Sequence, residues 1–234
     1  MSTNSIQENL RSIQDRIEEA ARRAGRHAEE ITLIGISKTH PAEAIRQAYE
    51  AGVRHFGENR VQEWEAKRGA VADLAAAVHL VGHLQSNKAA RAAEFFDCLD
   101  SVDDAALAQR LDRARQANPE KKLRILIEVR LATEESKSGV DPAVLPRLAE
   151  DLVQKPNLEL AGLMCIPPYL ENAEQVRSYF QRLRELRGDL ETRVGLKLPV
   201  LSMGMSHDFE VAIEEGATEV RIGTALFGAR QVKG

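Results

Sequence analysis

One lysine in the sequence lies where a carbonyl-reactive amine is expected. Lys38 directly follows the apolar run 31–37, and in an extended strand its side chain would point to the same side as Ile34 and Ile36. Partial burial at a strand end lowers the pKa of a lysine, and the neutral amine can then attack an aldehyde to form a Schiff base. Taken alone, Lys38 fits an ordinary strand-end lysine better, so a chemical role requires a second site opposite it.

Two segments near the end of the chain offer such a site. Ser-Met-Gly-Met-Ser (202–206) and Gly-Thr-Ala (223–225) each follow a β-type run, and the second opens a short helix. Glycine allows close backbone approach, hydroxyls donate hydrogen bonds, and these two loops commonly bind phosphate in α/β barrels. Ordinary turns with capping Ser and Thr are an equally good interpretation at this point. A lysine opposite a phosphate site is the arrangement that a phosphorylated aldehyde would need.

The remaining sequence predicts the elements that would hold these residues. An amphipathic helix is expected over about residues 5–24, and helical periodicity recurs at 41–51, 103–116, 142–154, 173–190 and 209–215. Eight short β-type runs alternate with such segments: 31–37, 53–56, 78–81, 95–99, 123–131, 158–164, 198–203 and 219–222. This alternation predicts a parallel sheet closed into a (β/α)8 TIM barrel, with the site at the C-terminal strand ends. An open doubly wound sheet is the alternative, but the glycine fingerprint expected after its first strand is missing.

Length and charge limit the class of protein. The 234 residues fit a single barrel domain over 1–234, and no linker or compositional shift divides them. The net charge of −4 gives no general attraction to nucleic acid or to an anionic membrane. We see no signal peptide and no apolar run near the roughly 20 residues that span a bilayer, and we expect a soluble cytoplasmic protein.

Neither the cysteines nor the histidines have the spacing of a metal site. Cys98 and Cys165 lie in apolar surroundings and are expected to be reduced thiols in the core. We therefore predict no metal. Structural or surface roles are expected for the histidines, which are His27, His40, His55, His79, His83 and His207.

Six groups of residues resemble a known family. They are Ile36-Ser37-Lys38-Thr39, Phe56-Gly57-Glu58-Asn59, Leu84-Gln85-Ser86-Asn87-Lys88, Ser136-Lys137-Ser138-Gly139, Gly162-Leu163-Met164, and a long run from Leu201 through Arg221 to Arg230. In this order, over about residues 5–231, the chain resembles the pyridoxal phosphate homeostasis proteins, also called the proline synthetase co-transcribed homologues. His83 and His207 depart from the family pattern, which often has a small residue at the first position and an acidic residue at the second.

The resemblance implies a barrel like the N-terminal domain of alanine racemase, without the C-terminal β domain of that enzyme. It also implies pyridoxal 5'-phosphate (PLP) bound as a Schiff base on Lys38. Lys137 could form a second, weaker PLP site, although a plain surface lysine is the simpler interpretation. The implied contacts are Ser202, Gly223 and Thr224 to the phosphate, with Ser206 or the Met205 backbone, Arg221 beside the pyridine nitrogen, Asn59 near the ring, and Met164 as a wall.

A guanidinium beside the pyridine argues against efficient catalysis. PLP enzymes that form carbanions often pair this nitrogen with a carboxylate, whereas Arg221 stays charged and cannot take up its proton. Alanine racemase shares the arginine but adds a tyrosine base from its second domain. Here only Tyr169 is expected near the mouth of the barrel. We therefore expect a non-catalytic PLP carrier, a monomer or weak homodimer, with apo PLP-dependent enzymes as possible partners.

Two alternatives remain open from the sequence. The first is a PLP-dependent amino-acid racemase with slow turnover. The second is a phosphosugar-processing barrel in which Lys38 forms its Schiff base with the substrate instead of a cofactor. The yellow colour of bound PLP would separate the second alternative from the other readings.

Overall fold

Eight parallel strands form a closed barrel in the computed structural model, which describes residues 5–118, 120–132 and 138–228. Each strand pairs with the next in chain order, and β1 pairs with β8 to close the ring. The predicted (β/α)8 fold is therefore confirmed. The strands are β1 (Thr32–Ile36), β2 (His55–Glu58), β3 (Ala77–Leu80), β4 (Cys98–Val102), β5 (Leu123–Glu128), β6 (Leu158–Met164), β7 (Val200–Met205) and β8 (Glu219–Ile222).

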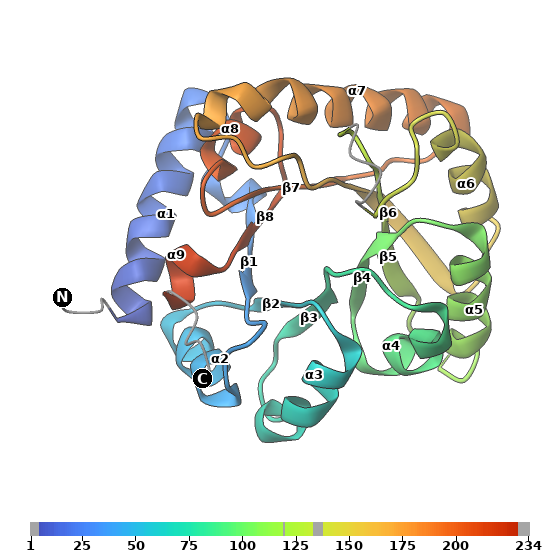
Figure 1. Ribbon diagram of the computed structural model, residues 1–234, viewed down its shortest axis with the longest axis horizontal. Coiled ribbons are helices and arrows are strands. Elements are labelled where there is room, and N and C mark those ends of the chain that lie inside the picture. Colours follow the sequence, from blue (N-terminus) through green and yellow to red (C-terminus); the bar gives the residue numbers. More distant parts are fainter. Residues whose placement is uncertain (1–4, 119, 133–137, 229–234) are drawn as a thin grey trace.

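Helices form an outer ring around the strands (Figure 1). Strand residues that face outward, such as Leu99, Ile125 and Leu163, are fully or almost fully buried beneath this ring. Of the described helices, none is long and apolar enough to cross a membrane. The helices are α1 (Ile6–Arg23), α2 (Ala42–Ala51), α3 (Val61–Lys67), α4 (Ala89–Phe95), α5 (Ala105–Arg115), α6 (Leu145–Leu152), α7 (Arg177–Val194), α8 (Phe209–Glu214) and α9 (Thr224–Phe227).

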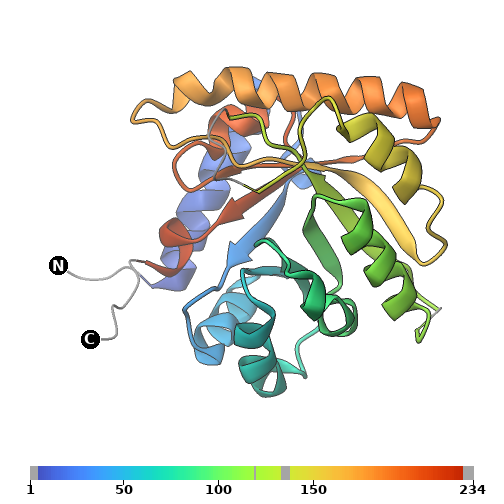
Figure 2. The same ribbon diagram turned by 45° about the vertical axis from the view of Figure 1, so that its right-hand side comes forward.

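The N-terminal helix α1 matches the predicted amphipathic segment. Ser5 caps it by accepting a hydrogen bond from the backbone of Glu8, whose side chain accepts one from the Ser5 backbone in return. Its apolar face buries Leu10, Ile13 and Ile17 and packs on α8 and α9, so the helix covers the seam between the first and last strands (Figures 1 and 2).

The predicted strand 95–99 is displaced from the observed one. Phe95 ends α4, and β4 begins only at Cys98, so Asp100 lies inside the strand and not in the following loop. The aromatic pair 95–96 suggested a strand, but Phe96 packs near the ring of Trp64 outside the barrel. Likewise β7 extends to Met205, which the sequence assigned to a loop, with Gly204 at a φ of +92°.

The interior of the barrel is only partly apolar. An inner cluster contains Leu126, Ala161, Met164 and Val200. Several other inward positions carry buried polar side chains, and two groups of these lie at different levels. Ser202 and Arg221 lie near the C-terminal mouth of the barrel, whereas His79, Asp100 and Glu219 lie deeper.

Candidate functional site

The C-terminal ends of the strands surround a cavity of about 410 Å³, which we call the mouth cavity. This volume falls in the range of small-molecule sites, roughly 300–1,000 Å³. Lys38 lines the mouth cavity together with six other residues predicted to bind PLP: Asn59, Met205, Ser206, Arg221, Gly223 and Thr224. The other two predicted residues, Met164 and Ser202, are not among its lining residues and are fully buried in the barrel wall.

The backbone next to Lys38 is held by a buried lysine of α3. The Lys67 ammonium lies 2.7 Å from Oε1 of Glu58 and donates hydrogen bonds to the carbonyls of Ser37 (3.0 Å) and His40 (3.2 Å). Ser37 Oγ also donates to Glu58 Oε1 at 2.5 Å. Since Ser37 and His40 flank Lys38, these contacts fix the turn from which the Lys38 side chain projects.

Thr39 completes this turn in an unusual conformation. Its φ of +67° is the only positive value among the described non-glycine residues. A side chain with a Cβ atom is disfavoured in this left-handed region, so the surrounding contacts must maintain it. The Thr39 amide donates a hydrogen bond to the carboxylate of Glu63, which also pairs with Lys67 at 3.2 Å. The turn that carries Lys38 is therefore shaped by α3.

Elsewhere around the mouth cavity, the loop after β7 is tied to α9, which follows β8, the neighbour of β1. Ser206 Oγ accepts a hydrogen bond from the Ala225 amide at 3.3 Å, which brings the two predicted phosphate segments together. The Met205 amide donates to Oδ1 of Asp208 at 2.6 Å and is thus engaged within its own loop. Burial raises the pKa of Asp208, against the opposing effect of this hydrogen bond. Among the hydroxyls, Thr224 is exposed at the rim.

Arg221 provides a fixed positive charge that borders the mouth cavity. Its guanidinium is buried and donates hydrogen bonds to Oγ of Ser202 (2.9 Å) and to the carbonyl of Cys165 (2.8 Å). Burial raises the pKa of the Cys165 thiol to about 12, so this group stays protonated and is a poor nucleophile. Cys98 and Cys165 are both free and buried, as predicted.

The sequence analysis did not predict Glu128, which also lines the mouth cavity. Glu128 is the last residue of β5 and is buried, and its Oε1 accepts a hydrogen bond from Ser138 Oγ at 2.9 Å. Burial raises the pKa of this carboxyl group. A charged residue within the apolar run Leu-Ile-Glu-Val (126–129) was the available signal.

Two other predicted features lie at the edge of the site or beyond it. Tyr169 lines the mouth cavity but is exposed, and its ring lies 5.1 Å from that of His207. The proposed second lysine, Lys137, lies outside the described residues.

Comparison with known proteins agrees with this geometry. The family model for the alanine racemase N-terminal domain matches residues 4–231. The pyridoxal phosphate homeostasis protein of Pseudomonas aeruginosa is 50% identical over 228 residues, which cover 97% of this chain and 96% of that protein. The homologue with the same name from Aquifex aeolicus is 48% identical over 225 residues, covering 96% and 98%. The chain belongs to the pyridoxal phosphate homeostasis family.

A solved structure of the same fold extends the comparison. PipY from Synechococcus elongatus, determined with PLP bound, is 41% identical and superposes with a TM-score of 0.85, covering 96% of this chain and 100% of PipY. The family resemblance predicted from the sequence motifs is therefore confirmed.

Proposed function

We propose that this chain binds PLP in the mouth cavity, covalently through the amine of Lys38, and acts in PLP homeostasis as a carrier. The observation that carries the proposal is the convergence of Lys38, Arg221 and the two hydroxyl-bearing loops on one cavity. Homologues named pyridoxal phosphate homeostasis protein and the PLP-bound PipY structure support it. On this proposal residues 1–234 form a single PLP-binding domain in the cytoplasm.

The residues present fit this cofactor chemically. Ser206 and Thr224 offer hydroxyl donors in the same cavity as Lys38, which suits a phosphate group. Gly223 also lines the cavity, and a Cβ added there would lie 3.5 Å from Cβ of Ile36, so β1 approaches the end of β8 closely. When bound, PLP would supply an aldehyde that condenses with amines.

Arg221 favours the role of a carrier over that of an efficient enzyme. Its contacts with Ser202 and the Cys165 carbonyl hold the guanidinium in one orientation, and it would keep a neighbouring ring nitrogen unprotonated. Thr224 and Tyr169 are exposed at the rim, which leaves the cavity open to solvent and to an incoming protein. This openness suits release of PLP to apo-enzymes, with the chain acting as a monomer or weak homodimer.

Slow amino-acid racemisation is the second candidate, and Glu128 is the observation that favours it. A buried carboxyl group with a raised pKa, lining the same cavity, could exchange a proton with a bound amino acid. Incubation with single L-amino acids, followed by chiral analysis, would test this activity. Efficient turnover that Glu128→Gln abolishes would replace the carrier role with an enzymatic one.

Borohydride reduction followed by peptide mapping tests the covalent anchor. We expect the reduced cofactor on the peptide that contains Lys38 and none in Lys38→Ala. The matched control is Lys88→Ala, which removes a lysine from a neighbouring cavity at the same end of the barrel. A reduced adduct on another side chain, or no retained vitamin B6 compound, would refute the proposal.

The phosphate contacts can be tested by comparing PLP with pyridoxal, which lacks the phosphate. Replacing Ser206 and Thr224 together by alanine should weaken binding of PLP more than binding of pyridoxal. Each lost hydrogen bond to a charged group is worth roughly 1.5–3 kcal/mol, or about 10-fold to 100-fold in affinity. Equal losses for both ligands would show that these residues do not bind the phosphate.

A further inference from the structure

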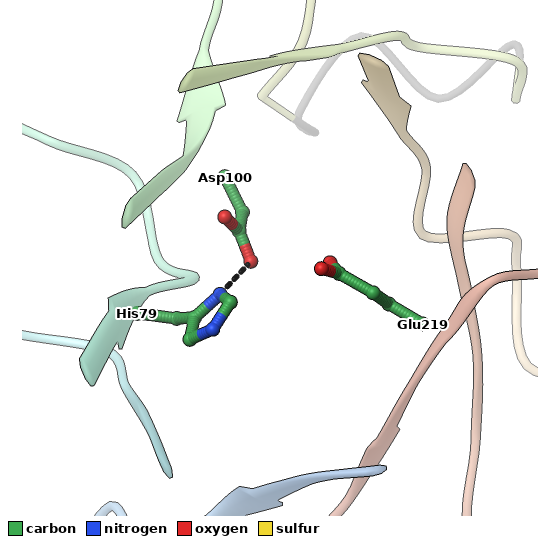
Figure 3. Close-up of side chains that lie close together, drawn as sticks. All are labelled: His79, Asp100 and Glu219. Carbon is green, nitrogen blue, oxygen red and sulfur yellow. Dashed lines mark hydrogen bonds and ion pairs between the residues drawn. The ribbon is translucent and has the colours of Figure 1, made fainter. Parts of the chain in front are cut away.

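A second polar cluster lies inside the barrel, below the mouth cavity. It consists of His79 on β3, Asp100 on β4 and Glu219 on β8, and we call it the lower cluster (Figure 3). The side chains are 0%, 0% and 4% exposed, and their nearest nitrogen and carboxylate oxygen atoms all lie within 4.8 Å of one another. None of the three residues lines the mouth cavity. The lower cluster is therefore separate from the proposed PLP site.

Two oxygen atoms of the lower cluster lack partners. Oδ1 of Asp100 and Oε2 of Glu219 are buried and accept no hydrogen bond from the described part of the chain. Leaving a buried carboxylate oxygen unsatisfied is costly, and such groups usually contact water or an ion. Figure 3 shows the carboxylate of Glu219 directed toward Asp100 and the His79 ring, and an oxygen of Asp100 bonded to Nδ1 of His79. The cluster thus has unused acceptor capacity on both carboxylates.

The hydrogen bonds of His79 leave one ring nitrogen suited to a metal. Its Nε2 lies 3.0 Å from Nδ1 of His55, and its Nδ1 lies 3.0 Å from Oδ2 of Asp100. Nδ1 of His55 can accept the Nε2–H of His79. A metal-binding histidine commonly donates its second N–H in this way. Nδ1 then faces the two carboxylates.

Nδ1 of His79 and Oδ2 of Asp100 lie 3.0 Å apart, so a hydrogen bond joins them when no metal is bound. A divalent cation would take the place of the proton that these two atoms share, and binding would release that proton to solvent.

Arg124 orients the third ligand and limits the charge of the cluster. Its Nη2 lies 2.6 Å from Oε1 of Glu219, whose Oε2 has no hydrogen-bond partner among the described residues; Nη1 lies 3.5 Å from Sγ of Cys98. Arg124 and a divalent ion would together carry three positive charges against the two carboxylates. Exchanging one proton for a divalent ion leaves a single excess positive charge, which the buried site can accommodate only if the ligand bonds are strong. This requirement favours a transition metal over Mg²⁺ or Ca²⁺.

A cavity lies near the lower cluster at the N-terminal end of the barrel. Its volume is about 450 Å³, it lies between α1 and the starts of β1 and β2, and His55 and Thr32 are among its lining residues. His55 also contacts His79, so it separates this cavity from the lower cluster.

We propose that His79, Asp100 and Glu219 form a structural Zn²⁺ site that links β3, β4 and β8 inside the barrel. One imidazole nitrogen and two carboxylate oxygens are ligands that Zn²⁺ accepts at about 2.0–2.2 Å, with water in the fourth position. Such ligands lie roughly 3.3–3.6 Å apart around a tetrahedral ion. A separation near the 4.8 Å limit of the cluster must therefore shrink by about 1 Å, whereas Nδ1 of His79 and Oδ2 of Asp100, which are 3.0 Å apart, must move slightly apart. The histidine spacing in the sequence did not predict this site, because its ligands come from three separate strands.

Metal titration of the full chain tests the proposal. After chelator treatment, the protein should bind one equivalent of Zn²⁺, release about one proton, and unfold at a higher temperature. Glu219→Gln and Asp100→Asn should each weaken binding at least tenfold. The matched control is Asp103→Asn, which alters a histidine–aspartate pair outside the lower cluster, in which His83 is exposed and its Nδ1 lies 3.5 Å from Asp103 Oδ2. Lys38→Ala should bind Zn²⁺ like the unmodified chain.

Several results would overturn the site. These are no stoichiometric binding, equal binding by Glu219→Gln and the unmodified chain, or loss of binding in Lys38→Ala. If the variants fail to fold, X-ray absorption of the Zn²⁺-loaded unmodified chain decides the question. One nitrogen and oxygen ligands in the first shell support the proposal, and sulfur or several imidazoles refute it.

Discussion

Lys67 and Glu58 form an ion pair that should contribute strongly to stability. The Lys67 side chain is 10% exposed, Glu58 is 0% exposed, and Nζ lies 2.7 Å from Oε1. Lys67→Met keeps the length of the side chain and removes the charge. Removing one partner of a buried pair costs about 3–5 kcal/mol, because the other charge remains buried. Exposed pairs usually contribute about 0–1 kcal/mol.

The loss in Lys67→Met should depend on pH. Burial raises the pKa of Glu58, and the Lys67 charge opposes this effect. A carboxyl group with a raised pKa in the folded state binds more protons than in the unfolded state, so stability falls as the pH rises through the folded pKa. Removing Lys67 raises that pKa further. The free energy of unfolding should therefore differ more between the variant and the unmodified chain at pH 8 than at pH 5. This difference can change by at most about 1.4 kcal/mol per pH unit.

Urea unfolding at pH 5 and pH 8, followed by circular dichroism, measures these differences. Arg193→Met is the matched control, since Arg193 pairs with Glu150 at 2.6 Å on the exposed surface. The double variant Lys67→Met with Glu58→Gln should regain part of the lost stability, because the fully buried charge of Glu58 is removed and only the partly exposed Glu63 loses a partner. A loss below about 1 kcal/mol at pH 8, or one that does not change with pH, would refute this reasoning.

Three further changes test the barrel and its site. Gly162→Ala would place a Cβ 1.9 Å from the Val200 carbonyl oxygen, so β6 and β7 must separate, and urea unfolding should show a loss of about 3 kcal/mol or more. Asp104 caps α5, because its Oδ1 accepts a hydrogen bond from the Leu107 amide at 2.7 Å. Asp104→Ala should therefore lower the free energy of unfolding by about 1 kcal/mol in the same assay, whereas Asp104→Ser should retain most of this stability. Arg221→Gln should weaken PLP binding about 10-fold to 100-fold in a spectroscopic titration, and unchanged affinity would exclude Arg221 from the site.

Local sequence patterns were enough to predict the barrel and much of its mouth. Periodicity distinguishes strands from helices, and eight alternations imply closure of a parallel sheet. Closure of the barrel brings every C-terminal strand end to one rim. Lys38 and Gly223 could therefore be predicted to line the same cavity, although they lie 185 positions apart in the sequence. The short segments that follow strands therefore carried most of the information about the mouth cavity.

The tertiary structure alone decided which buried polar side chains meet. Glu58 points outward to Lys67, whereas Asp100 and Glu219 point inward, and these directions depend on strand boundaries and register. The strand register shifts between Leu99 and Val102 and between Ser202 and Met205. These shifts change which neighbouring residues point into the barrel, and no local sequence pattern predicts them. Sequence periodicity reports the face of one strand, but contacts between strands arise only when the ring closes.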